Sequence, residues 1–177
     1  NGNMTMTMTG AADRIHIGNI CAPSGKFYWE ITVDGFTQSN DVGIGICKQT
    51  QVANGPWVSA GGPNVIMYNT NSGWNIYGTP QSSSNGSISN GDTLGVALDM
   101  DANNLYIYKN GVLWQTLSNY QSNAIDTTTP HTFFVDTYRS GSTAQLNCGQ
   151  RAFAYTPPTG YKVLNSYNLA NPSLPLV

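Results

Sequence analysis

Charge is scarce in this chain. Of its 177 residues only 9% are Asp, Glu, Lys or Arg, against about 25% in an average protein. Solubility must come instead from Ser, Thr, Asn, Gln and Gly, a composition common in virion and extracellular proteins. The seven Lys and Arg residues are scattered, and the net charge is −2. We therefore expect no nucleic-acid partner, because phosphate neutralisation needs clustered cations.

Cysteine and long apolar runs are also in short supply. The three cysteines are an odd number without CxxC spacing, so neither a disulfide framework nor a zinc site is expected. Cys47 and Cys148 fall in strand patterns and are predicted to be small core residues. No apolar run reaches membrane-spanning length, and we expect no membrane insertion. The chain starts at Asn1 rather than Met, so we expect an excised domain with neighbours in a larger polypeptide.

Helical periodicity is missing over any useful length, whereas strand signals recur. The clearest strand is 25–33, whose alternate residues divide cleanly between two faces. One face carries Phe27, Trp29, Ile31 and Val33, and the other carries Tyr28, Glu30 and Thr32. Large side chains on both faces favour a strand within a two-sheet sandwich over a half-solvated edge.

Other strand segments are separated by Gly, Asn, Ser and Pro clusters. Gly43 and Gly45 alternate with apolar residues and predict a close approach by a neighbouring backbone or ring. Asn110-Gly111 predicts a tight hairpin turn. We expect an all-β, two-sheet antiparallel sandwich over residues 1–165, followed by an extended tail or linker over 166–177. The remaining predicted strands are 3–9, 15–17, 42–46, 94–100, 105–108, 112–117, 132–138 and 143–147.

Several motifs, taken in order, resemble the SPRY (B30.2-type) domain. The motifs are Gly-Lys-Phe-Tyr-Trp-Glu (25–30), Val-Gly-Ile-Gly-Ile (42–46), Gly-Trp (73–74), Gly-Asp-Thr-Leu-Gly-Val-Ala-Leu-Asp (91–99), Tyr-Lys-Asn-Gly (108–111), Leu-Asn-Cys-Gly-Gln (146–150) and, beyond Phe153, Pro-Pro-Thr-Gly-Tyr (157–161). The resemblance implies a concanavalin-like sandwich, usually non-catalytic, that binds ligands through loops at one edge of a sheet.

The end of the chain refines this resemblance. Cys148 stands where many relatives have Phe, a departure that concerns the local packing and not the fold. The stretch 149–165 and the Pro-rich end look most like SPRY domains embedded in tailed-phage structural proteins. That similarity implies a place in a virion or tail.

Groups for catalysis are few. Glu30 is the only Glu, whereas glycoside hydrolysis needs two facing carboxylates. His16 and His131 are the only candidate bases, and no Gly-x-Ser-x-Gly elbow is present. We predict that Glu30 is a buried hydrogen-bonding residue and that both histidines are structural. The chain is therefore expected to be no enzyme and to need no cofactor.

One segment resembles part of a calcium loop. Residues 99–103 read Asp-Met-Asp-Ala-Asn, but Asn104 and Asn110 occupy the sixth and twelfth positions, where a calcium loop has Gly and Glu. Asp and Asn are also favoured turn residues. We predict a polar hairpin turn and no metal.

Three long connections, 49–64, 78–91 and 118–130, lack strand patterns, and such connections are often functional. Among their Asn, Gln and Ser residues lie Trp57, Tyr77 and Tyr120, rings suited to stacking on a sugar or anchoring a peptide. The alternative is that each ring folds back onto its own loop. Arg139, at a strand end, could add a bidentate hydrogen bond.

We expect the three connections to converge at one end of the sandwich and to present these rings together. The leading hypothesis is a binding module of a phage virion or tail-like protein that contacts a host-surface glycan or a partner protein. Two alternatives stay open. One is a cytoplasmic SPRY-type adaptor that binds a short peptide, and the other is an architectural virion domain without a ligand.

Overall fold

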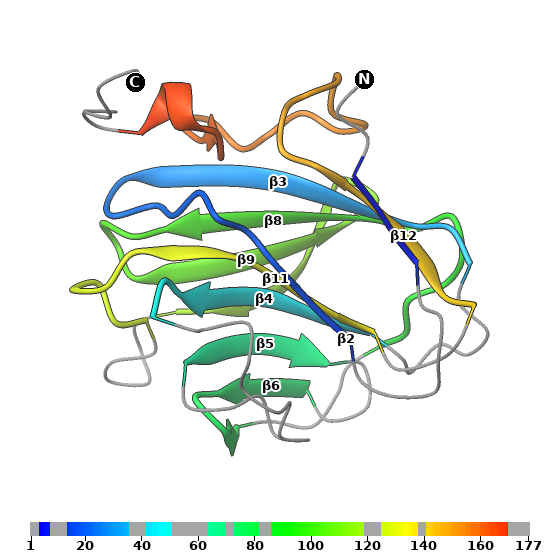
Figure 1. Ribbon diagram of the computed structural model, residues 1–177, viewed down its shortest axis with the longest axis horizontal. Helices are drawn as coiled ribbons and strands as arrows, with labels where there is room; N and C mark the ends of the chain where they lie inside the picture. The colour runs from blue at the N-terminus through cyan, green and yellow to red at the C-terminus, as the bar shows by residue number, and fades with distance from the viewer. Residues whose placement is uncertain are drawn as a thin grey trace.

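The computed structural model describes residues 4–7, 14–35, 42–50, 64–69, 73–81, 86–118, 125–137 and 141–169. Within these ranges the chain forms two sheets stacked as a sandwich (Figure 1), and the predicted all-β class is confirmed. Helical structure in this part is limited to one 3-10 turn, η2 (Ser166–Asn168). None of the described helical structure is long and apolar enough to cross a membrane.

The first sheet has the strand order β1-β12-β3-β8-β9-β10, and β13 pairs with β3. The pairs along this order are antiparallel, and β13 alone runs parallel to its neighbour. Its strands are β1 (Met4–Thr7), β3 (Lys26–Val33), β8 (Thr93–Asp99), β9 (Asn104–Lys109), β10 (Val112–Leu117), β12 (Thr143–Asn147) and β13 (Lys162–Val163).

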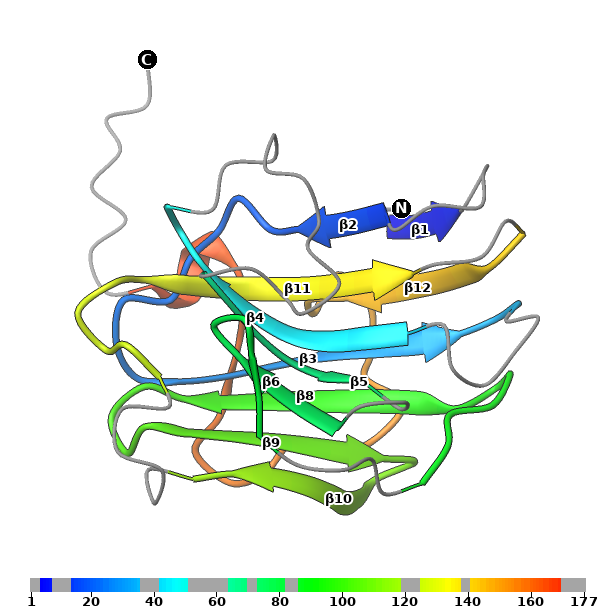
Figure 2. The same cartoon turned by 90° about the horizontal axis from the view of Figure 1, so that it is seen from below.

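The second sheet has the order β2-β11-β4-β5-β6-β7, again antiparallel. The two sheets lie face to face, and Figure 2 shows β3 behind β4 in the view from below. Its strands are β2 (Arg14–Ile17), β4 (Val42–Lys48), β5 (Val65–Asn69), β6 (Gly73–Ile76), β7 (Thr79–Pro80) and β11 (His131–Thr137).

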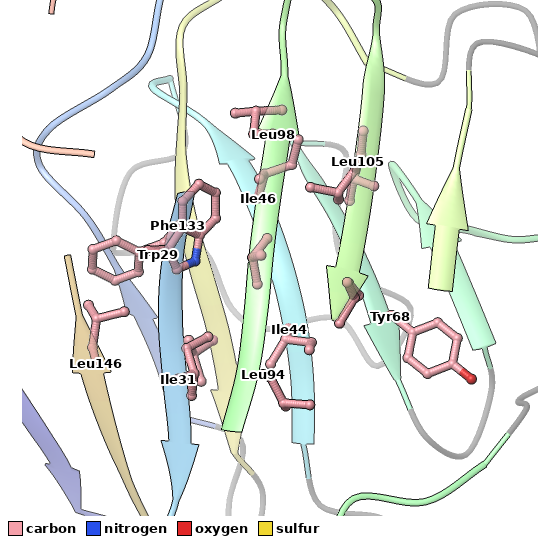
Figure 3. Close-up of a cluster of buried hydrophobic side chains, with 14 of the residues drawn as sticks. Trp29, Ile31, Ile44, Ile46, Tyr68, Leu94, Leu98, Leu105, Phe133 and Leu146 are labelled. Carbon is pink, nitrogen blue, oxygen red and sulfur yellow. The ribbon is translucent and has the colours of Figure 1, made fainter. Parts of the chain in front are cut away.

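The core fills the space between the sheets (Figure 3). The inward face of β3 supplies Trp29 and Ile31, both fully buried, as predicted from the alternation. The facing sheet contributes Ile44 and Ile46 from β4 and Phe133 from β11. Trp29 lies beside Phe133 in the close-up, so the large rings fill the centre of the sandwich.

The other face of β3 is buried as well. The ring of Phe153 meets Tyr28 edge to face, with ring centroids 5.0 Å apart. The Glu30 carboxylate accepts hydrogen bonds from the N–H groups of Ala154 and Tyr155, at 2.8 and 2.9 Å, and from the Tyr28 hydroxyl at 3.1 Å. A C-terminal segment therefore covers this face, and the prediction that Glu30 is a buried hydrogen-bonding residue is confirmed.

Two predictions that concerned glycine residues are confirmed by the structure. A Cβ on Gly45 would overlap the Ile66 carbonyl oxygen on β5 and lie 2.7 Å from the Met67 Cα, so the predicted close backbone approach is present. Asn110 and Gly111 adopt φ of 51° and 80° in the β9–β10 turn, as a tight hairpin requires.

The calcium-like segment forms the β8–β9 turn. Asp99 Oδ1 accepts hydrogen bonds from the N–H groups of Asp101 and Ala102, and Asp99 Oδ2 lies 2.9 Å from Lys26 Nζ. The carboxylate thus serves the turn and an ion pair. Across the described residues, no group of three or more His, Cys, Asp or Glu could hold a metal ion.

The C-terminal region continues along the first sheet. After β13, Asn165 caps η2 by accepting a hydrogen bond from the Asn168 N–H, and Leu169 packs against the core. The expected boundary between sandwich and tail at residue 165 stays a prediction. Cys47 is fully buried and Cys148 half-buried against the core, in agreement with their predicted packing.

Candidate functional site

Two of the long connections are rooted at the same end of the sandwich, which we call the loop end. The Lys48 N–H donates to the Asn64 carbonyl at 2.9 Å, which joins the two ends of the first connection. The next residue, Gln49, donates to the Pro130 carbonyl at 2.8 Å. Since Pro130 ends the third connection, the backbones of both connections are tied together where they leave the sheet.

Three side chains lock these roots, and we call them the loop-root cluster: Lys48, Tyr77 and Asp126. Lys48 Nζ lies 3.0 Å from Asp126 Oδ2 and 4.4 Å from the centroid of the Tyr77 ring. The Asp126 N–H donates to the Tyr77 hydroxyl at 2.9 Å. Lys48 thus contacts both other side chains, and Tyr77 holds the backbone of Asp126. Lys48 and Tyr77 border the first and second connections, and Asp126 lies within the third.

The carboxylate of Asp126 also organises its own connection. Both the hydroxyl and the N–H of Thr128 donate to it, as does the Thr129 hydroxyl at 3.0 Å. The Thr128 hydroxyl and Lys48 hold the pKa of this carboxyl well below its usual range. It therefore stays ionised across the physiological pH range, and the lysine keeps its partner.

His131 lies at the base of this cluster. It starts β11 opposite Lys48 and is fully buried, as expected of a structural histidine. Burial lowers its pKa to about 4, and both ring nitrogens are buried without a hydrogen-bond partner. The ring is therefore neutral at pH 7, which avoids a buried positive charge beside Lys48.

Tyr77 serves the loop end as an anchor. Its backbone adopts φ of 49°, its N–H donates to the Val65 carbonyl, and its half-buried ring packs against the core. Burial raises the pKa of its hydroxyl. This geometry matches the alternative in which the ring holds a loop in place, although it holds the third connection as well as its own. Whether Tyr77 also touches a ligand stays a prediction.

The other three predicted site residues, Trp57, Tyr120 and Arg139, lie outside the described residues. The connections that contain Trp57 and Tyr120 both end at the loop end, as described above. Arg139 follows β11, whose last residue, Thr137, pairs with Val42 at the end opposite Lys48. Its place relative to the loop-root cluster stays a prediction.

The connection 78–91 runs from one end of the sandwich to the other. It leaves from Tyr77 at the loop end, but its last residues reach the opposite end, where the Gly91 N–H donates to the Val33 carbonyl at 2.7 Å. Nearby, Lys109 Nζ donates to the Ser87 carbonyl. Convergence at the loop end thus holds for the roots of two connections and for one root of the third.

Lys48 and Asp126 were not singled out from the sequence. Lys48 stands where a strand pattern meets a long connection, and Asp126 lies within the connection 118–130, just before three successive threonines. These positions are the signal that could have drawn attention to them. Their pairing spans 78 positions and depends on the order of strands in the second sheet. That order is a tertiary property, so sequence patterns alone do not show it.

Comparison with known proteins places the chain in a family. The SPRY domain model matches residues 26–151, and the chain belongs to this family. The SPRY domain of human HERC1 superposes with a TM-score of 0.66 at 15% identity, covering 84% of this chain and 90% of that one. A second human SPRY domain gives a TM-score of 0.58 at 14% identity, with coverage of 86% and 95%. These likenesses establish the fold.

One curated relative is informative. The E3 ubiquitin-protein ligase TRIM9 of Drosophila melanogaster is 27% identical over 105 residues, which is 58% of this chain and 14% of that protein. The match thus spans about one seventh of the relative's length. SPRY domains are in general protein-binding modules without catalytic activity. These matches lend no support to the predicted similarity to tailed-phage proteins.

Proposed function

We propose that this domain is a non-catalytic recognition module that docks a short segment of a partner protein at the loop end. The observation that carries the proposal is the loop-root cluster of Lys48, Tyr77 and Asp126, which fixes the roots of two long connections side by side. Rigid roots lower the entropy lost when the connections close on a ligand. Membership of a protein-binding family supports the same conclusion.

The composition of the connections fits a peptide ligand. Residues 49–64 contain no charged side chain, and they are rich in Gly, Asn and Pro around Trp57. Tyr120 stands among Ser, Asn and Gln. Aromatic rings beside amides and hydroxyls provide anchor contacts and backbone hydrogen bonds for an extended peptide. In this proposal Trp57 and Tyr120 contact the ligand and Tyr77 positions the loops, while Arg139 remains a separate prediction.

The expected setting is a larger polypeptide. The matched Drosophila protein is a ubiquitin ligase in which this region is a small fraction of the length. By analogy we propose a cytoplasmic adaptor role, in which the domain selects the partner and other parts of the polypeptide act on it. This was the alternative hypothesis from the sequence, and the relatives favour it over a virion protein.

The proposal can be tested with peptide and glycan arrays probed by the 177-residue chain. We expect binding to one or more peptides and none to glycans. Trp57→Ala and Tyr120→Ala should each weaken binding of the selected peptide by about 1–3 kcal/mol, with little change in the stability of the fold. Tyr155→Ala is the matched control, because this half-exposed ring lies against Gly111, away from the loop end.

Three results would contradict the proposal. Binding to a glycan alone would restore the glycan hypothesis, and absence of any ligand at micromolar concentration would favour an architectural domain. Equal losses for Tyr155→Ala and Trp57→Ala would place the binding surface elsewhere.

A further inference from the structure

The third connection, 118–130, starts beside the β8–β9 turn of the first sheet and comes back to that turn before it reaches β11. The last residue of β10, Leu117, pairs with Leu105 near the start of β9. On the return, the Ile125 N–H donates to Asn103 Oδ1 at 2.9 Å, and Asn103 lies within the β8–β9 turn. The part of the connection that contains Tyr120 is therefore attached to the first sheet on both sides.

The residue after Ile125 is held by the second sheet. The Asp126 N–H donates to the Tyr77 hydroxyl at 2.9 Å, and the Asp126 carboxylate lies 3.0 Å from Lys48 Nζ. Lys48 ends β4 and Tyr77 follows β6. Figure 2 shows the ends of β4 and β8 and the start of β11 at the same, left-hand end of the sandwich. Two successive backbone N–H groups thus link the two sheets at the loop end.

The side chain of Ile125 fixes this link in depth. It is 2% exposed and belongs to the main core cluster. A backbone N–H beside so deeply buried a side chain needs a hydrogen-bond partner, and Asn103 supplies it. We call Asn103, Ile125, Asp126 and Tyr77 together the sheet clasp.

The backbone of the sheet clasp is unusual. Asn103 has φ of 60°, in the left-handed region that asparagine tolerates better than most residues. Among the residues that the structure describes, the non-glycine positions with positive φ are Tyr77, Asn103 and Asn110, and the first two belong to the clasp. Backbone strain of this kind persists where the surroundings over-determine it, and it gathers where ligands are held.

We infer that Asn103 is a positioning residue for the peptide site at the loop end, and that it acts through the backbone of Ile125 and Asp126. The inference rests on the proposed function. Without the Asn103 oxygen, the return of the third connection loses its hydrogen bond to the first sheet. Tyr120 then samples more conformations in the free protein, and more of them must be given up when a peptide binds.

Three variants of the 177-residue chain test the inference. Asn103→Gly removes the carboxamide and keeps a residue that adopts positive φ without strain. Asn103→Asp restores an acceptor oxygen at the same place, and a carboxylate accepts an N–H well. Asn110→Gly is the matched control: Asn110 has φ of 51°, and its Oδ1 accepts the Thr93 N–H at 2.9 Å in the β9–β10 turn, at the opposite end of the sandwich.

Amide hydrogen exchange of the chain without ligand reads the sheet clasp directly. In Asn103→Gly, protection of the Asp126 and Thr128 N–H groups should fall by about tenfold, although both donate to acceptors other than Asn103. The Ile125 N–H loses its acceptor in any case, so it does not decide the question. Asn103→Asp should keep the protection of Asp126 and Thr128, and Asn110→Gly should leave it at the wild-type level.

Calorimetry measures the effect on binding. The probe is the tightest-binding peptide that the wild-type chain selects from an array of random peptides. Asn103→Gly should weaken it by about threefold to tenfold, the range that corresponds to one lost hydrogen bond. Asn103→Asp and Asn110→Gly should each stay within about twofold of wild type. Thermal unfolding of the three variants verifies that each is folded at the temperature of the measurement.

The inference is overturned if Asn103→Gly exchanges its Asp126 and Thr128 amides at the wild-type rate, or if it binds the probe as tightly as wild type. Equal weakening by Asn110→Gly would also overturn it, as would failure of Asn103→Asp to restore the affinity. If the wild-type chain selects no peptide, the proposed function is wrong and the positioning role falls with it. The exchange rates still show in that case whether the sheet clasp holds the connection.

Discussion

The buried carboxylate of Glu30 gives the sharpest test of how this fold is held together. It is 2% exposed and has no lysine or arginine ion pair within the described residues. Its two oxygens divide their work: Oε2 accepts from the Ala154 N–H, and Oε1 accepts from the Tyr155 N–H and the Tyr28 hydroxyl. Two of these three bonds hold the C-terminal segment on the first sheet, and the third joins Glu30 to Tyr28 on the same strand.

A graded series of variants follows from this geometry. Glu30→Ala leaves two backbone N–H groups and a hydroxyl without their acceptor, and hydrogen bonds to charged groups contribute about 1.5–3 kcal/mol each. Because the three bonds share one site, the losses do not add fully, and we expect about 3–5 kcal/mol in the free energy of unfolding. Glu30→Gln replaces one acceptor oxygen by an NH₂ group that faces a backbone N–H, so about 1–3 kcal/mol is expected. Tyr28→Phe removes one hydrogen-bond donor and keeps the ring contact with Phe153, so we expect a loss of about 1 kcal/mol in the free energy of unfolding.

Urea denaturation measures the series, and each kcal/mol should lower Tm by about 2–4 °C for a domain of this size. Amide hydrogen exchange at Ala154 and Tyr155 is the local readout, since their protection should fall in Glu30→Gln more than that of β8. The reasoning is refuted if Glu30→Gln is as stable as wild type and both amides keep their protection. Ligand binding at the loop end should be unchanged in all three variants that fold.

Three further predictions concern packing, pH and salt. Gly45→Ala should lower the free energy of unfolding by about 3 kcal/mol or prevent folding, because the added Cβ meets the rigid backbone of β5. Gly91→Ala has open space around it and should lower the free energy of unfolding by only about 1 kcal/mol. Thermal unfolding of the two variants compares these losses. The pKa of His131 is lowered to about 4 from 6.5, so the unfolded chain binds the proton more readily than the folded one. The free energy of unfolding should therefore fall by up to about 3 kcal/mol as the pH drops from 6.5 to 4, and burial of His16 adds to the loss. His131→Gln should make the free energy of unfolding less dependent on pH over this range. Peptide affinity at the loop end should change less than about threefold between 50 and 500 mM salt, because the connections are almost uncharged; a steep salt dependence measured by calorimetry would contradict this.

Much of the fold could be predicted because its signals are local. The alternation in 25–33 identified both the inward residues of β3 and the second buried face. The Asn110-Gly111 pair located a hairpin, since positive φ is a property of the residues themselves. The glycines of β4 predicted a close backbone approach. In each case the pattern within a few residues determines the structure.

The site could be predicted only in outline, because its decisive contacts are not local. The sequence identified the long connections but not which of their ends meet. Lys48 meets Asp126 because β4 pairs with β11 in one particular register. Tyr77 was expected to contact a ligand, and its use as an anchor depends on a backbone N–H 49 positions away.

The placement of charge connects these findings to function. Three of the four lysines pair with aspartates at turns or loop roots: Lys26 with Asp99, Lys48 with Asp126 and Lys109 with Asp92. In each pair the carboxylate also accepts a backbone N–H, so each pair fixes a turn as well as a charge. A chain with so few charges thus uses many of them to hold its connections in place. In the proposed function, recognition falls to the rings and amides of the connections, whose contribution depends on fit at short range, so we expect selectivity to reside in the shape of the loops.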